Sequence, residues 1–257
     1  MRISSPYWLP VLAVYASVGA VCAQAADSRV VKAKEDAPEP AEIIAIDMGV
    51  TAATHSVFGD LGVLFAPYGG LDVSGFRAHV GTNDGRYSYV DKDSGERIHG
   101  FGEEADILFG YSFNFDANKL FESSSFLLMA GANLQTDRLD VSDPENPVQG
   151  GRYGFKTSAE FYSNPTEKTL FSVQGQYSTA FNAYYSEILA GYAVAPEVFF
   201  GPTVAFLGDD HYEQWRAGAM LTGVKVGRTE FNVQGGFMRD RDQGNGAFAT
   251  VGAYIRY

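Results

Sequence analysis

The sequence predicts an all-β fold: an antiparallel up-and-down transmembrane β-barrel of about 12 strands, of the outer-membrane type. Three observations predict it. Segments after Glu42 alternate apolar and polar residues with a period of two, which is the side-chain period of a β-strand. The connections between them alternate between long polar loops and tight turns. The 29 glycines, 14% aromatic content and mean hydropathy of −0.11 suit a sheet that is apolar on one face only.

The last segment shows the pattern most fully. Counted in steps of two, every residue from Ala247 to Tyr257 is apolar, whereas the other set, from Phe248 to Arg256, is mixed and carries a charge. Such a strand has one face that meets an apolar medium. It stops on an aromatic residue, as the closing strands of outer-membrane barrels tend to do. We expect this strand to close the barrel.

The residues before the barrel predict an exported protein. Residues 1–25 combine Arg2, an apolar run and the cleavage signal Ala23-Gln24-Ala25, which together form a secretory signal peptide. Residues 26–41 are charged and proline-containing and predict a flexible periplasmic leader. The barrel is expected over 42–257. Cys22 is the only cysteine, so the mature chain is predicted to have no disulfide and no cysteine metal site.

The earlier segments are defined by their outward apolar residues. In chain order, the first six sets are Ile44, Ile46, Met48 and Val50; Val57, Leu61, Val63 and Phe65; Phe76, Ala78 and Val80; Ala105, Ile107, Phe109, Tyr111, Phe113 and Phe115; Phe126, Leu128, Ala130, Ala132 and Leu134; and Tyr153, Phe155, Ala159 and Phe161. The third segment loses phase near Asp84-Gly85, where we expect a bulge or the membrane edge.

The second half continues the pattern. Its outward sets are Phe171, Val173 and Tyr177; Ile188, Ala190 and Tyr192; a weakly alternating segment around 198–207 that contains Pro202; Trp215, Ala217, Ala219 and Leu221; and Phe231, Val233 and Phe237. With a periplasmic N-terminus, the outer loops are 53–56, 90–101, 137–149, 180–183, 208–212 and 240–246, and the inner turns are 67–73, 116–122, 164–168, 195–196 and 227–228. Long outer loops and short inner turns are typical of outer-membrane barrels.

The alternative fold is a soluble barrel or sandwich whose apolar face points inward. The polar set is rich in Gly, Ser, Asn, Gln and charge, which would fill a dry core poorly, so the pattern favours lipid outside and a wet lumen. A net charge of −12 argues against nucleic acid as a partner, because phosphate binding requires a basic surface.

Charged and aromatic residues are predicted to share the lumen. The inward acids are Asp47, Asp60, Glu104, Asp106, Glu160, Glu187 and Glu230, and the inward bases are Arg77, His79, Arg152, Lys156, Arg216 and Arg256. Because unpaired buried charge is costly, we expect these groups to pair across strands. Contacts with a glucan are a candidate role for Tyr162, Tyr185 and Tyr254, together with Glu104, Asp106, Arg152 and Arg216. The alternative for the tyrosines is space-filling.

Four stretches carry a family resemblance: residues 143–152, 177–184, 201–218 (Gly201-Pro202 and Leu207 to Gly218) and 239–242. They resemble the bacterial cellulose biosynthesis protein BcsS, over roughly Asp47 to Tyr257. This resemblance implies a non-enzymatic accessory protein of cellulose synthesis or secretion in the outer membrane, as scaffold, anchor or conduit. Its partners would be outer-membrane lipid and, by implication, cellulose and components of a synthase or export complex. The resemblance implies no catalytic residue, cofactor or metal.

Two other functions remain open from the residues. A small outer-membrane diffusion channel needs only an open lumen. A lipid hydrolase or acyltransferase needs a serine or threonine beside a histidine; His55, His99 and His211 lie in predicted outer loops, with Ser56 and Ser94 near in sequence, but no G-x-S-x-G motif occurs. Asp209-Asp210-His211 allows a metal or catalytic site, whereas a solvated turn explains the same residues.

Overall fold

The computed structural model describes residues 41–118 and 121–257, so the predicted signal peptide and nearly all of the predicted leader lie outside the described residues. Within them the chain forms a closed barrel of twelve antiparallel strands, which confirms the predicted fold class. The strands are β1 (Ile44–Ala53), β2 (Ser56–Phe65), β3 (Gly75–Val90), β4 (Arg97–Asn118), β5 (Phe121–Leu139), β6 (Gly150–Thr166), β7 (Thr169–Ser178), β8 (Tyr184–Ala195), β9 (Val198–Gly208), β10 (Glu213–Val226), β11 (Thr229–Asp240) and β12 (Gly244–Arg256). None of the described residues belongs to a helix that could cross a membrane.

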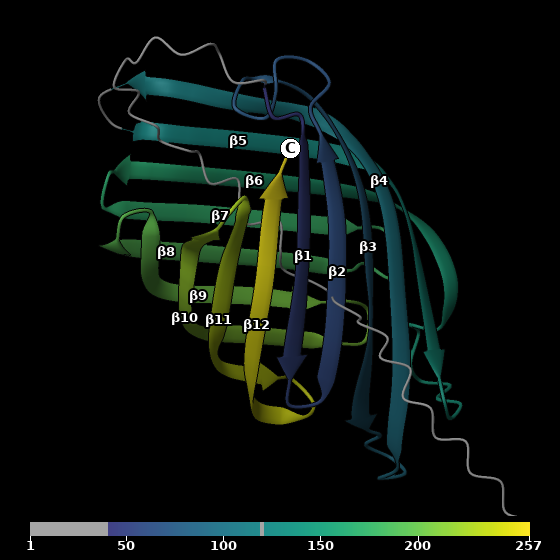
Figure 1. The fold of residues 1–257 in the computed structure, drawn as a ribbon. Coiled ribbons are helices and arrows are strands. Elements are labelled where there is room, and N and C mark those ends of the chain that lie inside the picture. The colour runs from purple at the N-terminus through teal and green to yellow at the C-terminus, as the bar shows by residue number, and fades with distance from the viewer. Residues whose placement is uncertain (1–40, 119–120) are drawn as a thin grey trace, which may run out of the picture.

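Each strand pairs with its neighbours in sequence, and β12 closes the barrel on β1. The closing register runs from Ala45↔Arg256 to Ala53↔Phe248 without a shift. In Figure 1 the strands around β1 and β12 run steeply in front, and β5 to β8 cross behind them at a large angle, as expected for strongly tilted barrel strands. The predicted closing role of the last strand is therefore confirmed.

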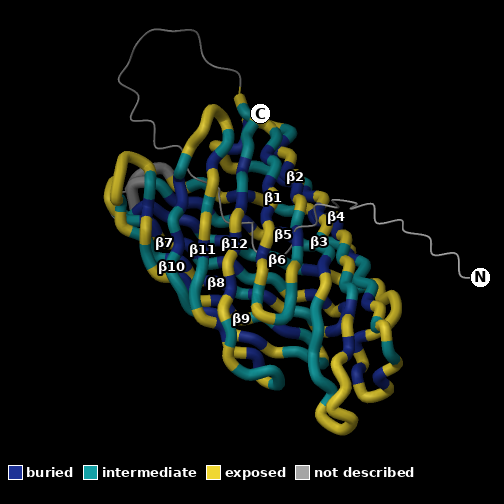
Figure 2. Tube along the Cα trace, turned by 60° about the horizontal axis from the view of Figure 1, so that its bottom comes forward, coloured by how far each residue is buried: buried dark blue, intermediate teal, exposed yellow. Residues whose placement is uncertain are grey.

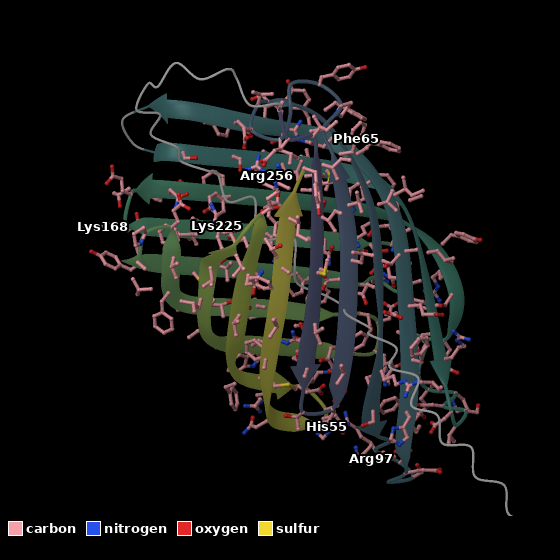
Figure 3. The ribbon with its side chains drawn as sticks, in the orientation of Figure 1. His55, Phe65, Arg97, Lys168, Lys225 and Arg256 are labelled. Carbon is pink, nitrogen blue, oxygen red and sulfur yellow. The ribbon has the colours of Figure 1, made fainter. Side chains whose placement is uncertain are left out.

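The two ends of the barrel differ in their connections. We call the end that holds Tyr257 the terminal end; it carries the turns 66–74, 167–168, 196–197 and 227–228. The opposite end, here the far end, carries the connections 54–55, 91–96, 140–149, 179–183, 209–212 and 241–243. Phe65 and Arg256 mark the terminal end in Figure 3, and His55 and Arg97 mark the far end.

Burial alternates along the strands as the sequence predicts (Figure 2). The outward residues include a broad apolar belt, in which Val80 is 54% exposed and Ile107 is 52% exposed. Their inward neighbours are buried, as Leu108 and Asp106 are. Soluble proteins rarely expose apolar surface of this extent to water, so the belt is the surface that contacts lipid.

The phase change near Asp84 is not a bulge. β3 pairs with β2 and with β4 in one continuous register through this region, which excludes the bulge that the sequence allowed. Instead, the outward residues become charged: Asp84 lies across from Glu103, and Glu103 binds Arg138 at 2.5 Å. Charged side chains at this level mark the edge of the apolar belt, which is the other alternative that the sequence allowed. The register shifts that do occur lie near the terminal-end turns of β6–β7, β8–β9 and β10–β11.

The terminal half of the lumen is filled by apolar side chains. One cluster consists of Ala45, Leu64, Ala66, Leu71, Leu108, Leu127, Met129 and Tyr254. A second consists of Tyr162, Leu170, Leu189, Phe199 and Met220, with Ala193 packed against it. These residues interdigitate as in a protein core, so this half of the barrel is packed.

Arg77 fixes the turn 66–74 over the terminal end. Its guanidinium is fully buried and donates hydrogen bonds to the carbonyl oxygens of Leu71 at 3.1 Å, Val73 at 2.6 Å and Phe76 at 3.0 Å. The Leu71 N–H also donates to the Glu42 carbonyl at 2.8 Å. Hydrogen bonds from a charged donor are stronger than neutral ones, so the turn is held firmly. Arg256 adds ion pairs with Asp72 and Glu42 on the same side.

The belt assignment predicts the effect of an outward charge. Ile107→Arg, within the belt, should cost on the order of 2 kcal/mol or more of folding free energy in bilayers, because a buried arginine costs roughly 2–4 kcal/mol at the midplane. Tyr153→Arg, at an outward residue that is 84% exposed near the far end, should cost about 0–1 kcal/mol. Urea titration of barrels folded in phospholipid vesicles measures both. Equal costs would contradict the assignment.

Candidate functional site

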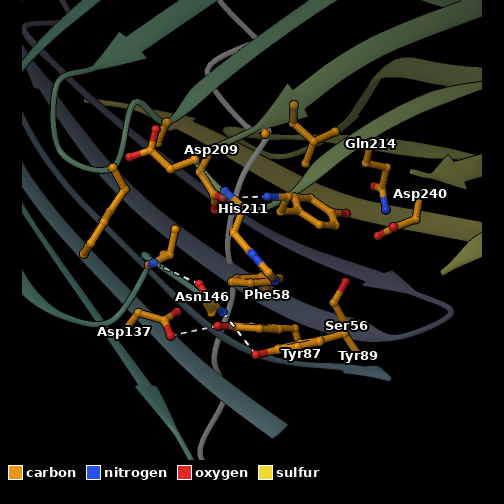
Figure 4. Close-up of a pocket in the computed structure, with 18 of the residues that line it drawn as sticks. Ser56, Phe58, Tyr87, Tyr89, Asp137, Asn146, Asp209, His211, Gln214 and Asp240 are labelled. Carbon is orange, nitrogen blue, oxygen red and sulfur yellow. Dashed lines mark hydrogen bonds between the residues drawn. The ribbon is translucent and has the colours of Figure 1, made fainter. Parts of the chain in front are cut away.

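The far end contains a cavity of about 620 Å³ inside the barrel mouth, which we call the vestibule (Figure 4). Four strands that are longer than the others form much of its wall. β3, β4, β5 and β6 have 16, 22, 19 and 17 residues, whereas the other described strands have between 10 and 14. The long strands continue past the charged level of Asp84 and Glu103, and they carry much of the vestibule wall beyond the apolar belt.

Three aromatic rings lie in a row on this wall. The ring centroids of Phe58 and Tyr87 are 6.3 Å apart with an interplanar angle of 7°, and those of Tyr87 and Tyr89 are 6.2 Å apart at 15°. Phe58 faces Gly85 across the β2–β3 pair, and Tyr87 faces Gly100 across the β3–β4 pair.

The two glycines are required for the rings to lie flat. A Cβ at Gly85 would come within 2.4 Å of the Phe58 ring, and one at Gly100 within 2.1 Å of the Tyr87 ring. Both contacts are impossible for a real side chain, so only glycine permits the rings to cover the backbone of the neighbouring strand. Phe58 and Tyr87 therefore each lie against the wall, and all three aromatic residues line the cavity.

Hydrogen bonds hold the tyrosines in these positions. The Tyr87 hydroxyl donates to Asp137 Oδ1 at 2.7 Å, and the Tyr89 hydroxyl donates to Asp143 Oδ2 at 2.6 Å. Asn146 Nδ2 donates to the Tyr89 oxygen at 3.1 Å. Asp143 Oδ1 also accepts the N–H of Glu145 at 3.1 Å, an Asx-type bond that agrees with a rigid turn in the loop 140–149.

Contacts between loops form a strap at one side of the mouth. Lys92 Nζ, in the β3–β4 connection, lies 2.5 Å from Asp242 Oδ1 in the β11–β12 turn. The Val90 N–H donates to Gln243 Oε1 at 3.0 Å, and Gln243 Nε2 donates back to the Val90 oxygen at 3.4 Å. Because only β2 and β1 lie between β3 and β12 in the barrel, these contacts span one side of the opening, at the β1–β2 turn.

The strap remains charged in mildly acidic solution. Burial acts to raise the pKa of Asp242, but the hydrogen bond and charge of Lys92 and the charge of Arg241 outweigh it, so the pKa lies below its ordinary value. The Tyr89 ring meets the His211 ring edge-on at a centroid distance of 5.4 Å, which connects the strap to the turn 209–212.

Asp209 organises that turn. Its Oδ1 accepts the N–H groups of His211 and Tyr212, both at 2.8 Å. Burial raises the pKa of the Asp209 carboxyl, although these two N–H donors act in the opposite direction. Asp210 accepts from Asn182 Nδ2 at 2.7 Å. Within residues 41–118 and 121–257, no group of three or more His, Cys, Asp or Glu side chains could hold a metal ion.

The serine and histidine residues considered for a hydrolase have other contacts. The Ser94 hydroxyl donates to Asp91 Oδ1 at 2.5 Å, and the N–H of His99 donates to Asp140 Oδ1 at 2.8 Å. The His211 ring lies against Tyr89. His55 and Ser56 both line the vestibule as neighbours in the β1–β2 turn region.

A network of buried charges forms the vestibule floor. Lys156 Nζ lies 2.8 Å from Glu104 Oε1 and 2.6 Å from Asp106 Oδ2, and His79 Nδ1 lies 3.1 Å from Asp106 Oδ1. Asn133 Nδ2 donates to Glu104 at 3.0 Å. For Glu104, Asp106, His79 and Lys156 this is the cross-strand pairing that the sequence predicts. The prediction fails for two other inward acids, because Asp60 Oδ2 and both carboxyl oxygens of Glu160 are buried without a hydrogen-bond partner among the described residues. Beneath the network lie two much smaller spaces, of about 80 and 10 Å³.

The predicted glucan-contact residues separate into four groups. Tyr185, Glu104 and Arg216 line the vestibule. Arg152 lies at its rim, where its guanidinium is 4.4 Å from the Phe181 ring centroid and 3.7 Å from Asp210. Asp106 lies in the floor network, whereas Tyr162 and Tyr254 belong to the apolar clusters of the terminal half.

The aromatic row and Asp137 are not among the site residues that the sequence predicts. The sequence does show that Phe58, Tyr87 and Tyr89 are large residues in the inward phase of their strands, which predicts that they face the lumen. Their arrangement depends on the glycines across the strand pairs, which periodicity within one strand does not reveal. By contrast, each of the four stretches that carry the family resemblance contributes residues to the vestibule, among them Asp143, Tyr184, Asp209 and Asp240.

Comparison with known proteins identifies a family and a fold. The family model for cellulose biosynthesis protein BcsS matches residues 48–257. No curated protein sequence matches the chain. Among solved structures, the COG4313 outer membrane channel from Pseudomonas putida F1 is similar with a TM-score of 0.57 and 13% identity, covering 88% of this chain and 100% of that one.

Two further barrels resemble the chain more distantly. The KdgM porin has a TM-score of 0.46 at 11% identity over 83% of this chain and 99% of that one. Outer membrane phospholipase A from Escherichia coli has a TM-score of 0.43 at 11% identity over 86% and 94%. At such identities the likeness to the Pseudomonas putida channel shows the fold alone, and the two weaker matches carry no argument.

The strap predicts a pH-dependent distance. Because the pKa of Asp242 is lowered from 3.8, the Lys92–Asp242 pair should persist above about pH 4 and be lost only as the pH falls through that lower value. Spin labels on Asp93→Cys and Asn245→Cys should give a narrow distance distribution at pH 7 and a somewhat broader one once Asp242 is protonated, because the Gln243–Val90 hydrogen bonds remain. Since an exposed ion pair contributes little alone, the double variant Asp242→Asn/Gln243→Ala should be broad already at pH 7. A variant distribution as narrow as the parent's would refute the strap.

Proposed function

The chain belongs to the cellulose biosynthesis protein BcsS family and forms an outer-membrane type barrel, and from these two facts we propose that it is a non-enzymatic accessory protein of bacterial cellulose production that anchors the polymer at the cell surface. The predicted signal peptide would direct export, and the leader would lie in the periplasm. The far end and its vestibule then face the exterior. Outer-membrane lipid surrounds the belt, and cellulose and components of a synthase or export complex are the proposed partners.

The filled terminal half supports an anchor over a conduit. A glucan that passed through the lumen would have to displace both apolar clusters and the Arg77-bound turn 66–74. Packed cores do not yield such space without large free-energy costs. The vestibule of about 620 Å³ lies at the far end, and the space of about 80 Å³ below its floor is much smaller. The polymer would therefore meet this protein at the surface, after export by another route.

Deletion of the gene tests the role in cellulose production. The deletion strain should show altered amount or architecture of cellulose, measured by dye binding and by electron microscopy of the fibrils. Sensitivity to large antibiotics, which reports general outer-membrane permeability, should stay at the parental level. Complementation with the intact gene should restore the parental phenotype. Cellulose of normal yield and architecture in the deletion strain would count decisively against the proposal.

Planar-bilayer recording tests the anchor against a channel. The purified barrel should insert without steady conductance, because two clusters of apolar side chains fill the terminal half of the lumen. A porin purified in the same detergent, whose conductance reports its insertion, serves as the control. Stable, large unitary conductance of the unmodified protein would overturn the closed-lumen account and favour a diffusion channel.

A further inference from the structure

We propose that the vestibule is a binding site for the end of an uncharged, hydroxyl-rich glycan chain, with Phe58, Tyr87 and Tyr89 as its stacking surface; the choice of a β-linked glucan as ligand rests on the proposed function. Three independent features of the vestibule carry this inference: flat aromatic faces, carboxylates with an oxygen left for a ligand, and a closed floor.

The aromatic row is shaped for a flat ligand. Three ring centroids follow one another at 6.3 and 6.2 Å with nearly parallel planes, and Gly85 and Gly100 allow two of the rings to lie against the wall. A sugar ring presents C–H groups on its faces, and these pack on aromatic faces. A row of such rings suits several consecutive sugars of an extended chain.

The surrounding carboxylates are suited to sugar hydroxyls. Among the residues that the structure describes, the hydrogen bonds of Asp137, Asp209 and Asp240 with protein donors engage Oδ1 of each. The second oxygen remains available as an acceptor. A carboxylate that is already fixed by the protein loses little further entropy when it accepts a hydroxyl, and such a bond is charge-assisted.

Charge selects against acidic polysaccharides. The described residues that line the vestibule include ten aspartates and glutamates but four lysines and arginines. An anionic chain would be repelled by this excess, whereas an uncharged chain would not. The acidic lining therefore favours a neutral glycan over a uronate or a phosphate-bearing one.

The floor determines how the chain binds. Lys156, Glu104 and Asp106 close the bottom of the vestibule with two short ion pairs. A ligand can therefore enter only from the far end, and it can insert an end but cannot thread through. The strap formed by Lys92 and Asp242 lies at one side of this entrance, so a linear chain must pass beside it.

Calorimetry with soluble oligosaccharides tests the site. The mature barrel, folded in detergent, should bind cellohexaose, and Tyr87→Ala should weaken binding roughly tenfold through loss of ring contact. Tyr87→Phe should retain most of the affinity, because the ring remains. Tyr153→Ala, an exposed outward tyrosine of the same end, is the matched control and should bind as the parent does. Heat-modifiable gel mobility verifies that every variant is folded.

Three results would overturn the proposal: no cellohexaose binding by the folded parent, undiminished binding by folded Tyr87→Ala, or equally tight binding of an oligogalacturonate of the same length. The binding test and the deletion test can fail independently of each other. If cellohexaose binds at the vestibule but the deletion strain makes normal cellulose, the site stands and the cellular role fails. If the parent binds no cellohexaose but the deletion alters cellulose, the role stands and the site fails.

Discussion

Inside a bilayer no water is available to a strand edge, so every backbone N–H and C=O must find a partner within the sheet, and the structure depends on this constraint. The pairing of β1 with β12, from Ala45↔Arg256 to Ala53↔Phe248, satisfies it by removing both edges. Once the sheet is closed, each strand has an inner and an outer face. The residues on the outer face form the lipid belt. Those on the inner face line the lumen and make its two ends different from each other.

The lumen is divided along its axis, and this division carries the functional interpretation. At the terminal end it is packed with leucine, methionine and aromatic side chains, and Arg77 holds the turn 66–74 over it. At the far end the same inner face becomes polar and widens into a cavity of about 620 Å³. Between the two lie paired charges centred on Lys156. A barrel of this construction displays a pocket to the exterior while it seals the membrane.

Much of the fold could be predicted from sequence because one rule, the alternation of side chains across a strand, governs it locally. Val80 and Ile107 face outward as predicted, and the far-end connections lie close to their predicted positions. The vestibule could not be predicted in the same way, because its contacts are non-local. Tyr87 lies on Gly100 through strand pairing, and Lys92 meets Asp242 across 150 positions of the chain. The direction of Tyr254 was predicted, but its packing with Leu64 and Leu108 depends on closure.

The central claim is that lipid contacts the apolar face of the strands and that the lumen lies behind it. The mature chain is expected to contain no cysteine, so a single fluorophore can be attached at Ile107→Cys, in the apolar belt, or at Gln135→Cys, which lines the open vestibule. In vesicles that contain brominated lipid, the label at 107 should be strongly quenched and the label at 135 should not. Equal quenching at the two positions, or stronger quenching at 135, would contradict the account.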